Sequence, residues 1–374
     1  MKIFYNHPAV ARMVVLWVVK KEFFAMSEQR NAFSCKLAVK SVMLRSGVLR
    51  LYSFFRPQSA VILCYHSVSP DRKGQGDYIP SGITVEAGLF DEQMRMLRQN
   101  YNPVTLDDIA DWMNGSKPLP PRSVAVTFDD GFEDNYTIAA PLMEKYGILG
   151  AVYLTVNAVI KDELPWFSRT IYLFEEARRR NMVLTDEELG RTWNLGNSEE
   201  NREAFQRYSH PCATMTGEVM ENYVATLEHW FALKLGITKL DLTQGPRMMS
   251  FVQARELRRR GHIIGNHTFS HGNMGHIPPE ALEQEIVKAN EILEQELGGK
   301  PEHFSYPHPC LNPQWSEQSL ALTKRIGFKT AVLTDAGVVT KKSNPLLLPR
   351  VYVGNDDAEA FCWRLENAFA GRMV

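Results

Sequence analysis

Short apolar runs that end abruptly in polar residues recur along this chain. Residues 60–65, 124–128 and 151–155 are the clearest of them, and they are rich in β-branched and aromatic side chains. Runs of this length without alternation are typical of strands buried on both faces, although periodicity alone does not separate them from a buried helix segment. Four further candidates complete a set of seven predicted strands: the run that follows Gly261, and residues 304–308, 329–334 and 349–353.

Helical patterns separate these runs. Residues 86–99 carry apolar side chains on one face, and residues 133–146 show a second helical pattern. A capping box at Ser250 predicts the start of a third helix. Pro279 opens a long helix whose apolar positions recur at intervals of three and four, and Gly298 ends it. Strands that alternate with helices in this way indicate an α/β fold.

The alternation stops between residues 157 and 247. This stretch contains helical patterns at residues 171–180 and 219–235, and it is far longer than an ordinary βα loop. We therefore predict one elaborated domain over residues 57–374, with residues 157–247 as a helical insertion. An insertion on the face that carries the candidate chemistry would form a lid or one wall of a substrate groove.

Two adjacent carboxylates, Asp129 and Asp130, follow directly on the run at 124–128. Consecutive side chains that leave a strand point in different directions. One carboxylate can therefore bind a metal ion while its neighbour faces the water or substrate on that ion. An Asp-Asp-Gly sequence is also common in solvent-exposed turns, so this motif alone leaves both interpretations open.

A pair of histidines, His267 and His271, follows the run after Gly261. On a helical turn, a spacing of four residues places both imidazoles on one side, within reach of a single ion. Together with the carboxylates at the strand end, the pair predicts a site of one carboxylate and two imidazoles. Three protein ligands leave a coordination position open for water, which is the arrangement of catalytic zinc sites.

These two motifs resemble those of the polysaccharide deacetylases that share the NodB homology domain, a carbohydrate esterase family 4-like group. The Thr-Phe-Asp-Asp-Gly run at 127–131 matches the first motif of the family, and the His-Thr-Phe-Ser-His run at 267–271 matches the second. The resemblance extends over roughly residues 60–355. It implies a distorted (β/α)7 barrel, similar to a TIM barrel.

The resemblance also implies roles for the matching residues. Asp129 would be the catalytic base, and Asp130, His267 and His271 would hold a divalent metal ion, with Zn²⁺ as the expected ion. The substrate class that it implies is an N-acetylated oligosaccharide or polysaccharide.

The positions of the polar residues along the strands agree with a closed barrel. Active sites of parallel barrels lie at the carboxyl ends of the strands. Five candidate residues lie just past such an end: His66, Asp129, Asp130, His267 and His308. A doubly wound open sheet would also gather residues there and is the competing fold. The chain has no Gly-x-Gly-x-x-Gly or Walker-type loop, which argues against a nucleotide.

The third motif departs from the pattern of the family. Many members have Arg-x-Pro-Tyr where this chain has Ser-Tyr-Pro-His at 305–308, followed by Pro309. The family uses a backbone N–H here to stabilise the oxyanion, and His308 retains one, whereas proline has none. The Asp-x-x-Asp-Trp motif of the family is not recognisable, and Arg350 is the candidate for the charged partner of Asp129.

The proton donor is a separate question, because the Leu-x-x-His motif of the family is not recognisable either. An amine leaves readily only when it is protonated, so an acid must lie near the nitrogen. His66 is the first candidate because it ends a strand on the same face as Asp129 and its side chain titrates near neutral pH. His308 is the alternative.

The predicted activity is metal-dependent hydrolysis of an N-acetyl group from a sugar in a polysaccharide or glycan precursor. One alternative is the hydrolysis of another non-peptide C–N bond, such as a cyclic amide. The other is a catalytically silent sugar-binding protein, which the altered third motif suggests. Aromatic residues of the insertion would stack on sugar rings or form the core of the insertion itself. They include Trp166, Phe167, Tyr172 and Trp230.

The overall composition limits the possible partners. The chain of 374 residues has 42 Lys+Arg and 43 Asp+Glu, which gives a net charge of -1, and it has no long basic tract. We therefore expect no nucleic-acid partner. Its five cysteines are odd in number and widely spaced. This pattern favours reduced thiols and hence a reducing compartment such as the cytoplasm.

Residues 1–56 are predicted to form a helical N-terminal extension. Residues 9–19 are apolar but are interrupted by Arg12, too short to span a bilayer, and not followed by a clear cleavage site. In residues 36–56, basic side chains alternate with apolar ones. Such an amphipathic segment packs on the domain or lies on an anionic membrane surface. Weak membrane-surface association is therefore the alternative to a purely cytoplasmic location.

Overall fold

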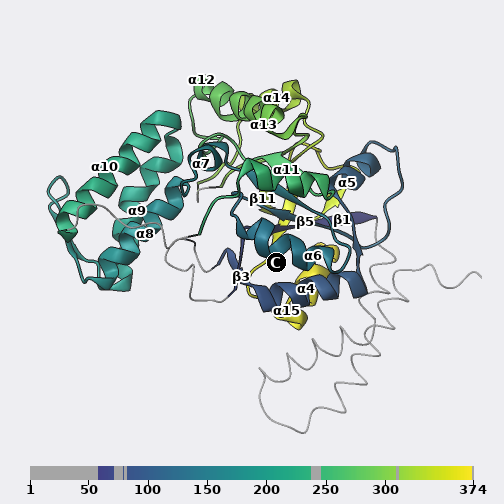
Figure 1. Cartoon of the computed structure of the whole chain (residues 1–374), viewed down its shortest axis with the longest axis horizontal. Coiled ribbons are helices and arrows are strands. Elements are labelled where there is room, and N and C mark those ends of the chain that lie inside the picture. Colours follow the sequence, from purple (N-terminus) through teal and green to yellow (C-terminus); the bar gives the residue numbers. More distant parts are fainter. Residues whose placement is uncertain (1–57, 71–78, 80–81, 237–245, 309–310, 373–374) are drawn as a thin grey trace, which may run out of the picture.

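A computed structural model describes residues 58–70, 79, 82–236, 246–308 and 311–372 (Figure 1). The predicted extension at residues 1–56 lies outside the described residues. No described helix is long and apolar enough to cross a membrane.

Seven parallel strands form a closed barrel. Their order around the barrel is β1-β13-β11-β10-β9-β6-β5, and β5 pairs with β1 to complete the ring. The closing pair runs in register from Ala60 opposite Ser123 to Tyr65 opposite Phe128. The closure confirms the predicted barrel and excludes the open sheet. The strands are β1 (Ser59–Tyr65), β5 (Ser123–Phe128), β6 (Gly150–Leu154), β9 (Ile263–Asn266), β10 (His303–Ser305), β11 (Thr330–Ala336) and β13 (Leu348–Tyr352).

Short strands extend the barrel at its edges. β12 (Val339–Thr340) pairs antiparallel with β1, and β4 (Asn102–Pro103) pairs with β5. β2 (Ser67–Ser69) and β3 (Thr84–Glu86) form a separate two-stranded sheet.

Alternation inside β1 shows why these runs form strands buried on both faces. Val61 and Leu63 belong to the cluster between the barrel and its helices, whereas Ala60 and Ile62 belong to a second cluster. All four side chains are fully buried. Successive side chains of a strand point to opposite faces, so a continuous apolar run fills both clusters at once.

Helices surround the barrel, and α4, α6 and α15 lie together on one side of it (Figure 1). The predicted capping box is present, with Ser250 accepting a hydrogen bond from the Gln253 N–H and Gln253 bonding back to Ser250. The predicted helix end at Gly298 is left-handed, with φ 68°. The helices are α4 (Ala87–Asn100), α5 (Leu106–Met113), α6 (Ala140–Glu144), α11 (Phe251–Arg259), α12 (Pro279–Leu282), α13 (Ala289–Leu297), α14 (Glu317–Ile326) and α15 (Ala358–Phe369). π-helical turns η1 (Asn135–Ala139) and η3 (Glu283–Lys288) precede α6 and α13.

The segment between β6 and α11 forms a separate lobe, in which α8, α9 and α10 pack together away from the barrel helices (Figure 1). It contains a β-hairpin in addition to the expected helices. The side chains of Leu184 and Trp193, which face each other across the hairpin, are buried, so the hairpin joins the hydrophobic core of the lobe. The elements are α7 (Val156–Lys161), α8 (Trp166–Arg179), β7 (Val183–Asp186), β8 (Arg191–Asn194), α9 (Ser198–Ser209), η2 (His210–Thr214) and α10 (Gly217–Leu235).

Candidate active site

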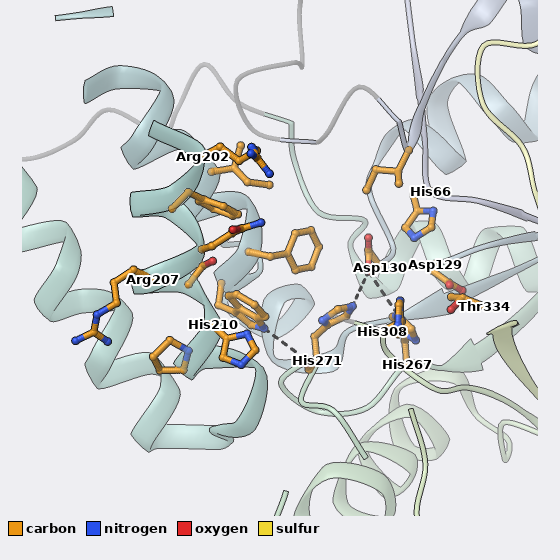
Figure 2. A pocket seen from close by; sticks show the side chains of 18 of the residues that line it. His66, Asp129, Asp130, Arg202, Arg207, His210, His267, His271, His308 and Thr334 are labelled. Carbon is orange, nitrogen blue, oxygen red and sulfur yellow. Dashed lines mark hydrogen bonds and ion pairs between the residues drawn. The ribbon is translucent and has the colours of Figure 1, made fainter. Parts of the chain in front are cut away.

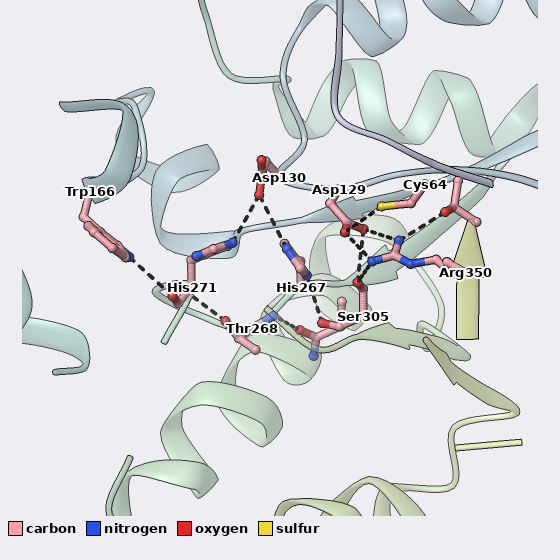
Figure 3. Close-up of polar contacts among 11 residues, drawn as sticks. Cys64, Asp129, Asp130, Trp166, His267, Thr268, His271, Ser305 and Arg350 are labelled. Carbon is pink, nitrogen blue, oxygen red and sulfur yellow. Dashed lines mark hydrogen bonds and ion pairs between the residues drawn. The ribbon is translucent and has the colours of Figure 1, made fainter. Parts of the chain in front are cut away.

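The two carboxylates that follow β5 lie in different surroundings. Both are buried, each with 1% of its surface exposed. Asp130 has a left-handed backbone (φ 74°), and so has Gly131 (φ 83°). A Cβ atom at Gly131 would lie 2.6 Å from Leu154 Cδ2, so this position requires glycine. The sharp turn directs Asp129 into the barrel and Asp130 towards the histidines (Figure 3).

Asp130, His267 and His271 converge on one point (Figure 3). The Nε2 atoms of His267 and His271 lie 3.5 and 3.4 Å from Asp130 Oδ1. Neither carboxylate oxygen of Asp130 has a hydrogen-bond partner in the described part of the chain, although both are buried. Ligand atoms bound tetrahedrally at about 2.0–2.1 Å are separated by roughly 3.3–3.4 Å. The three side chains therefore fit a metal ion such as Zn²⁺.

The loop that carries the histidines is irregular, so the two imidazoles meet without the helical turn on which the spacing argument was based. Thr268 and His271 both have left-handed backbones, with φ 68° and 60°. The Thr268 N–H donates to Asn266 Oδ1 (2.7 Å), and the His271 N–H donates to Thr268 Oγ1 (3.0 Å). Local hydrogen bonds of this kind compete with helix formation. The loop still brings both imidazoles to the same ion position.

Contacts outside the loop fix its orientation. His267 Nδ1 lies 2.8 Å from the Ser305 carbonyl oxygen, to which only a protonated nitrogen can donate, so its Nε2 lone pair faces Asp130. The buried Glu285 accepts hydrogen bonds from the N–H (2.8 Å) and hydroxyl (2.5 Å) of Ser270. Burial raises the pKa of Glu285, and the Ser270 donors oppose this rise.

The lobe between β6 and α11 also holds this loop. Trp166 Nε1 donates to the carbonyl oxygen of His271 (3.3 Å), and the Gly217 N–H donates to Ser270 Oγ (3.1 Å). The ring of Phe167 lies 4.8 Å from the His271 ring, measured between centroids. The lobe is therefore part of the support of the candidate metal site. No pattern in the sequence predicts these contacts, because they join irregular segments far apart in the chain.

Asp129 forms a buried ion pair with Arg350, the residue that the sequence suggested as its charged partner. Nη1 and Nη2 of Arg350 lie 2.8 and 2.5 Å from the two carboxylate oxygens. Ser305 Oγ (3.1 Å) and Cys64 Sγ (3.7 Å) also donate to Asp129. Burial opposes ionisation, but Arg350 and then His267 hold the pKa of Asp129 well below its usual range.

Ser305 and Cys64 are contacts of Asp129 that the sequence reasoning missed. Ser305 lies where many family members carry the arginine of the third motif. Its small side chain accepts a hydrogen bond from Arg350 Nη2 (3.2 Å), so the guanidinium reaches Asp129 from β13. Both residues lie on buried strands, and a polar residue within such a strand is the feature of the sequence that could have indicated these contacts.

The two candidate proton donors lie in the same cavity as Asp129. His66 is half-buried beside the ring of Tyr352, and its Nδ1 has no hydrogen-bond partner among the described residues. Burial lowers the pKa of His66, and the nearby Asp130 and Asp129 oppose this. His308 is also half-buried, and its Nε2 lies 3.2 Å from Asn312 Oδ1.

A second group of possible ligands, Cys64, His66 and Asp129, is less suited to a metal ion. Its ligand atoms lie within 4.8 Å of one another. Asp129 already pairs with Arg350, and burial raises the pKa of the Cys64 thiol. A thiol must lose its proton to bind a metal, so these surroundings disfavour binding.

A cavity of about 1150 Å³ joins the barrel face to the lobe (Figure 2). Trp166 and Phe167 line it, whereas Tyr172 and Trp230 pack in the core of the lobe. The aromatic residues of the lobe thus divide between the two expected roles. Every sequence-predicted site residue except Arg350 lines this cavity: His66, Asp129, Asp130, His267, His271 and His308.

The fold and site define a closed parallel barrel with a buried cluster of acids and histidines at the carboxyl ends of its strands. Residues 241–331 match the model of the polysaccharide deacetylase family. The chain is 15% identical to the deacetylase PplD of Streptococcus pyogenes, solved in complex with acetate. That match has a TM-score of 0.53 and covers 83% of this chain and 99% of the other.

Two relatives match over shorter segments. The poly-β-1,6-N-acetyl-D-glucosamine N-deacetylase of Escherichia coli is 32% identical over 87 residues, which are 23% of this chain and 12% of that protein. The chitooligosaccharide deacetylase of Azorhizobium caulinodans is 36% identical over 77 residues, 20% of this chain and 35% of that protein. The matches thus span about a third or less of either relative. Over these segments the chain is similar to polysaccharide deacetylases, and its barrel has the fold of the solved deacetylase.

We predict that the purified protein carries about one transition-metal ion per chain, as three convergent ligands imply. Asp130→Ala and His267→Ala should each lose the ion, because both remove a ligand at the shared point. His308→Ala is the matched control, since His308 lines the same cavity but lies outside the cluster. Elemental analysis of the four proteins measures this, and equal metal content in all of them would exclude the site.

Metal affinity should fall as the pH decreases through the titration range of His267. Burial disfavours protonation of this imidazole, but Asp129 and Asp130 outweigh burial and raise its pKa. A ligand must be neutral to bind, so the ion competes with this proton at and below neutral pH. Competition with a metal-sensitive dye at several pH values measures the trend.

We also predict that Arg350→Met destabilises the protein by about 3–5 kcal/mol, because it leaves the buried Asp129 without its counter-charge. The folded-state pKa of Asp129 is below the unfolded value, so the pair stabilises the fold at neutral pH and does so less as the pH falls below roughly 4. Urea unfolding measures the change. The exposed Arg180, paired with Glu176, supplies the control Arg180→Met, which should cost less than about 1 kcal/mol. Equal losses of stability in Arg350→Met and Arg180→Met would contradict the stabilising role of the buried pair.

Proposed function

We propose that this protein is a metal-dependent hydrolase that removes N-acetyl groups from N-acetylated sugars of a polysaccharide or glycan precursor. The observation that carries the proposal is the pairing, in one cavity, of the Asp130–His267–His271 cluster with the arginine-bound Asp129. Two relatives that match segments of this chain are named for the deacetylation of poly-N-acetylglucosamine and of chitooligosaccharides, which favours an N-acetylated glycan as the substrate.

The cluster fits zinc, because two imidazoles and one carboxylate are a common donor set for this ion. When bound, the ion would lower the pKa of a water molecule and polarise the amide carbonyl. Asp129 acts as the base that accepts a proton from the attacking water. Because its pKa is low, Asp129 is a weak base. It would therefore accept a proton only from a water molecule whose own pKa is lowered.

Arg350 keeps the catalytic base ionised and in place. Its two hydrogen bonds occupy both carboxylate oxygens, and Ser305 and Cys64 hold the same group from other strands. Such a fixed carboxylate loses little orientational freedom when the reaction begins.

Stabilisation of the oxyanion and protonation of the departing amine require other residues that line the cavity. The backbone N–H of His308 is the proposed donor to the oxyanion that forms as water attacks the carbonyl. The imidazolium of His66 is the proposed donor to the departing amine. Since burial lowers the pKa of His66, its protonated form should support turnover only up to a relatively low pH.

The direct test is acetate release from chitotetraose, with zinc supplied. We expect turnover by the natural chain and a fall of about 10²–10⁴-fold in Asp129→Asn, which keeps the shape of the side chain but removes the base. Acetate is measured by a coupled assay, and metal content is checked in parallel. Absence of acetate from a folded, metal-loaded chain would refute the proposal and favour a silent sugar-binding protein. Cleavage of a cyclic amide in place of chitotetraose would reassign the substrate.

A second test concerns the proton donor. His66→Ala should keep the metal ion, while kcat falls by roughly 10²–10⁴-fold and the basic limb of the pH–rate profile disappears. A substrate with a better leaving group than an alkyl amine should restore part of the lost rate. Near-normal kcat in this variant would pass the role to His308 or to solvent, and loss of the metal would instead make His66 part of the metal site.

A further inference from the structure

The wall of the cavity opposite the metal cluster is formed by one face of α9 and the first residue of η2 (Figure 2). Positions at intervals of three and four along a helix share a face. The residues of this face line the cavity and are Arg202, Phe205, Gln206, Ser209 and His210. We refer to them as the α9 wall. It presents one aromatic ring among several hydrogen-bonding groups.

Among the described residues, a positive charge beside this wall lacks a partner. The side chain of Arg202 has no ion pair or hydrogen bond to the described residues, whereas neighbouring charges are paired. Glu203, the carboxylate that lines the cavity here, pairs with Arg191, and Arg207 lies 3.7 Å from Asp186. A guanidinium is always protonated and matches the geometry of carboxylates and phosphates. Arg202 is exposed to solvent at the rim of the cavity, so its attraction for anions should be moderate and sensitive to salt.

The wall also has groups suited to a sugar residue. The side chains of Gln206 and His210 form no hydrogen bond to the described residues, so both are available to hydroxyl groups. Phe205 contributes a half-buried ring between Arg202 and Gln206 on the helix face. Aromatic rings pack on the apolar faces of ligands while nearby polar groups fix their orientation. The cavity volume of about 1150 Å³ leaves space for more than the reacting group at the metal cluster.

We propose that the α9 wall is a subsite for an anionic group, a carboxylate or a phosphate, on the part of the substrate next to the reacting N-acetyl sugar. The inference rests on the proposed deacetylase function and specifies its substrate class: an acidic N-acetylated glycan. Arg202 binds the anion, and Gln206 and His210 bind neighbouring hydroxyl groups. The same charge disfavours the ammonium group of a deacetylated neighbour, so a partly deacetylated chain is a poorer ligand than a fully acetylated one.

The test is direct binding to the full chain carrying Asp129→Asn, which limits turnover. Four probes are titrated by calorimetry with zinc present: a hyaluronan tetrasaccharide, which carries carboxylates, neutral chitotetraose, N-acetylglucosamine 1-phosphate, and neutral N-acetylglucosamine. At 50 mM NaCl one acidic probe should bind about three- to tenfold more tightly than its neutral counterpart. The hyaluronan fragment is compared with chitotetraose, and the sugar phosphate is compared with N-acetylglucosamine. The acidic probe that shows the preference identifies the anionic group as a carboxylate or a phosphate. The preference should shrink at 500 mM NaCl, because salt screens a partly exposed pair.

Arg202→Gln supplies the residue-level test, and Arg180→Gln is its matched control from an exposed ion pair elsewhere on the lobe. The preference for the acidic probes should disappear in Arg202→Gln and persist in Arg180→Gln. Equal affinities for acidic and neutral probes in the parent chain, or a preference that survives Arg202→Gln, would overturn the subsite. Binding is measured independently of turnover. An Arg202-dependent preference without acetate release from any substrate would refute the proposed function alone, and acetate release without the preference would refute the subsite alone.

Discussion

Two adjacent carboxylates, both almost completely buried, set the main physical constraint on this molecule. Asp129 and Asp130 cannot both remain ionised in the interior unless each has its own positive partner, because burying an unpaired charge is strongly unfavourable. The left-handed turn at Asp130 makes this possible by separating the two side chains. Asp129 receives a guanidinium from β13, whereas Asp130 faces two imidazoles from the loop after β9, and the cation that these three side chains would hold is its positive partner. The closed barrel is what brings these distant segments together.

The strands of the barrel were predicted well from the sequence, because burial on both faces of a strand leaves a continuous apolar run. All seven strands of the barrel were found as short apolar runs, and the helix limits at Ser250 and Gly298 followed from capping chemistry. Helical spacing was the argument for bringing His267 and His271 together, but the loop at 267–271 is not helical. Its conformation depends on hydrogen bonds to Asn266, Glu285 and Trp166, and residue spacing carries no information about such partners. The β-hairpin of the lobe was missed because it is short and lies among stronger helical patterns.

Arg350 illustrates what a motif comparison can and cannot predict. The Asp-x-x-Asp-Trp motif of the family is not recognisable in this chain, and Arg350 was the candidate for the charged partner of Asp129. The bidentate contact with Asp129 depends on the space beside Ser305, a small residue at the place of the arginine in the third motif. That space is a property of the folded barrel.

The lobe between β6 and α11 is a similar case, since it both supports the loop of His271 and forms the far wall of the cavity. Changes in the lobe should therefore affect the metal cluster as well as ligand binding.

The central claim is that Asp130, His267 and His271 together hold a metal ion. X-ray absorption at the zinc edge of the zinc-loaded full chain tests it most directly. We expect two imidazole nitrogens at about 2.0–2.1 Å and carboxylate oxygen at about 2.0–2.2 Å, with no sulfur ligand. The imidazole signal should decrease in His271→Ala. A sulfur ligand at about 2.3 Å would place the ion at Cys64 instead and contradict the account, and so would a spectrum that His271→Ala leaves unchanged.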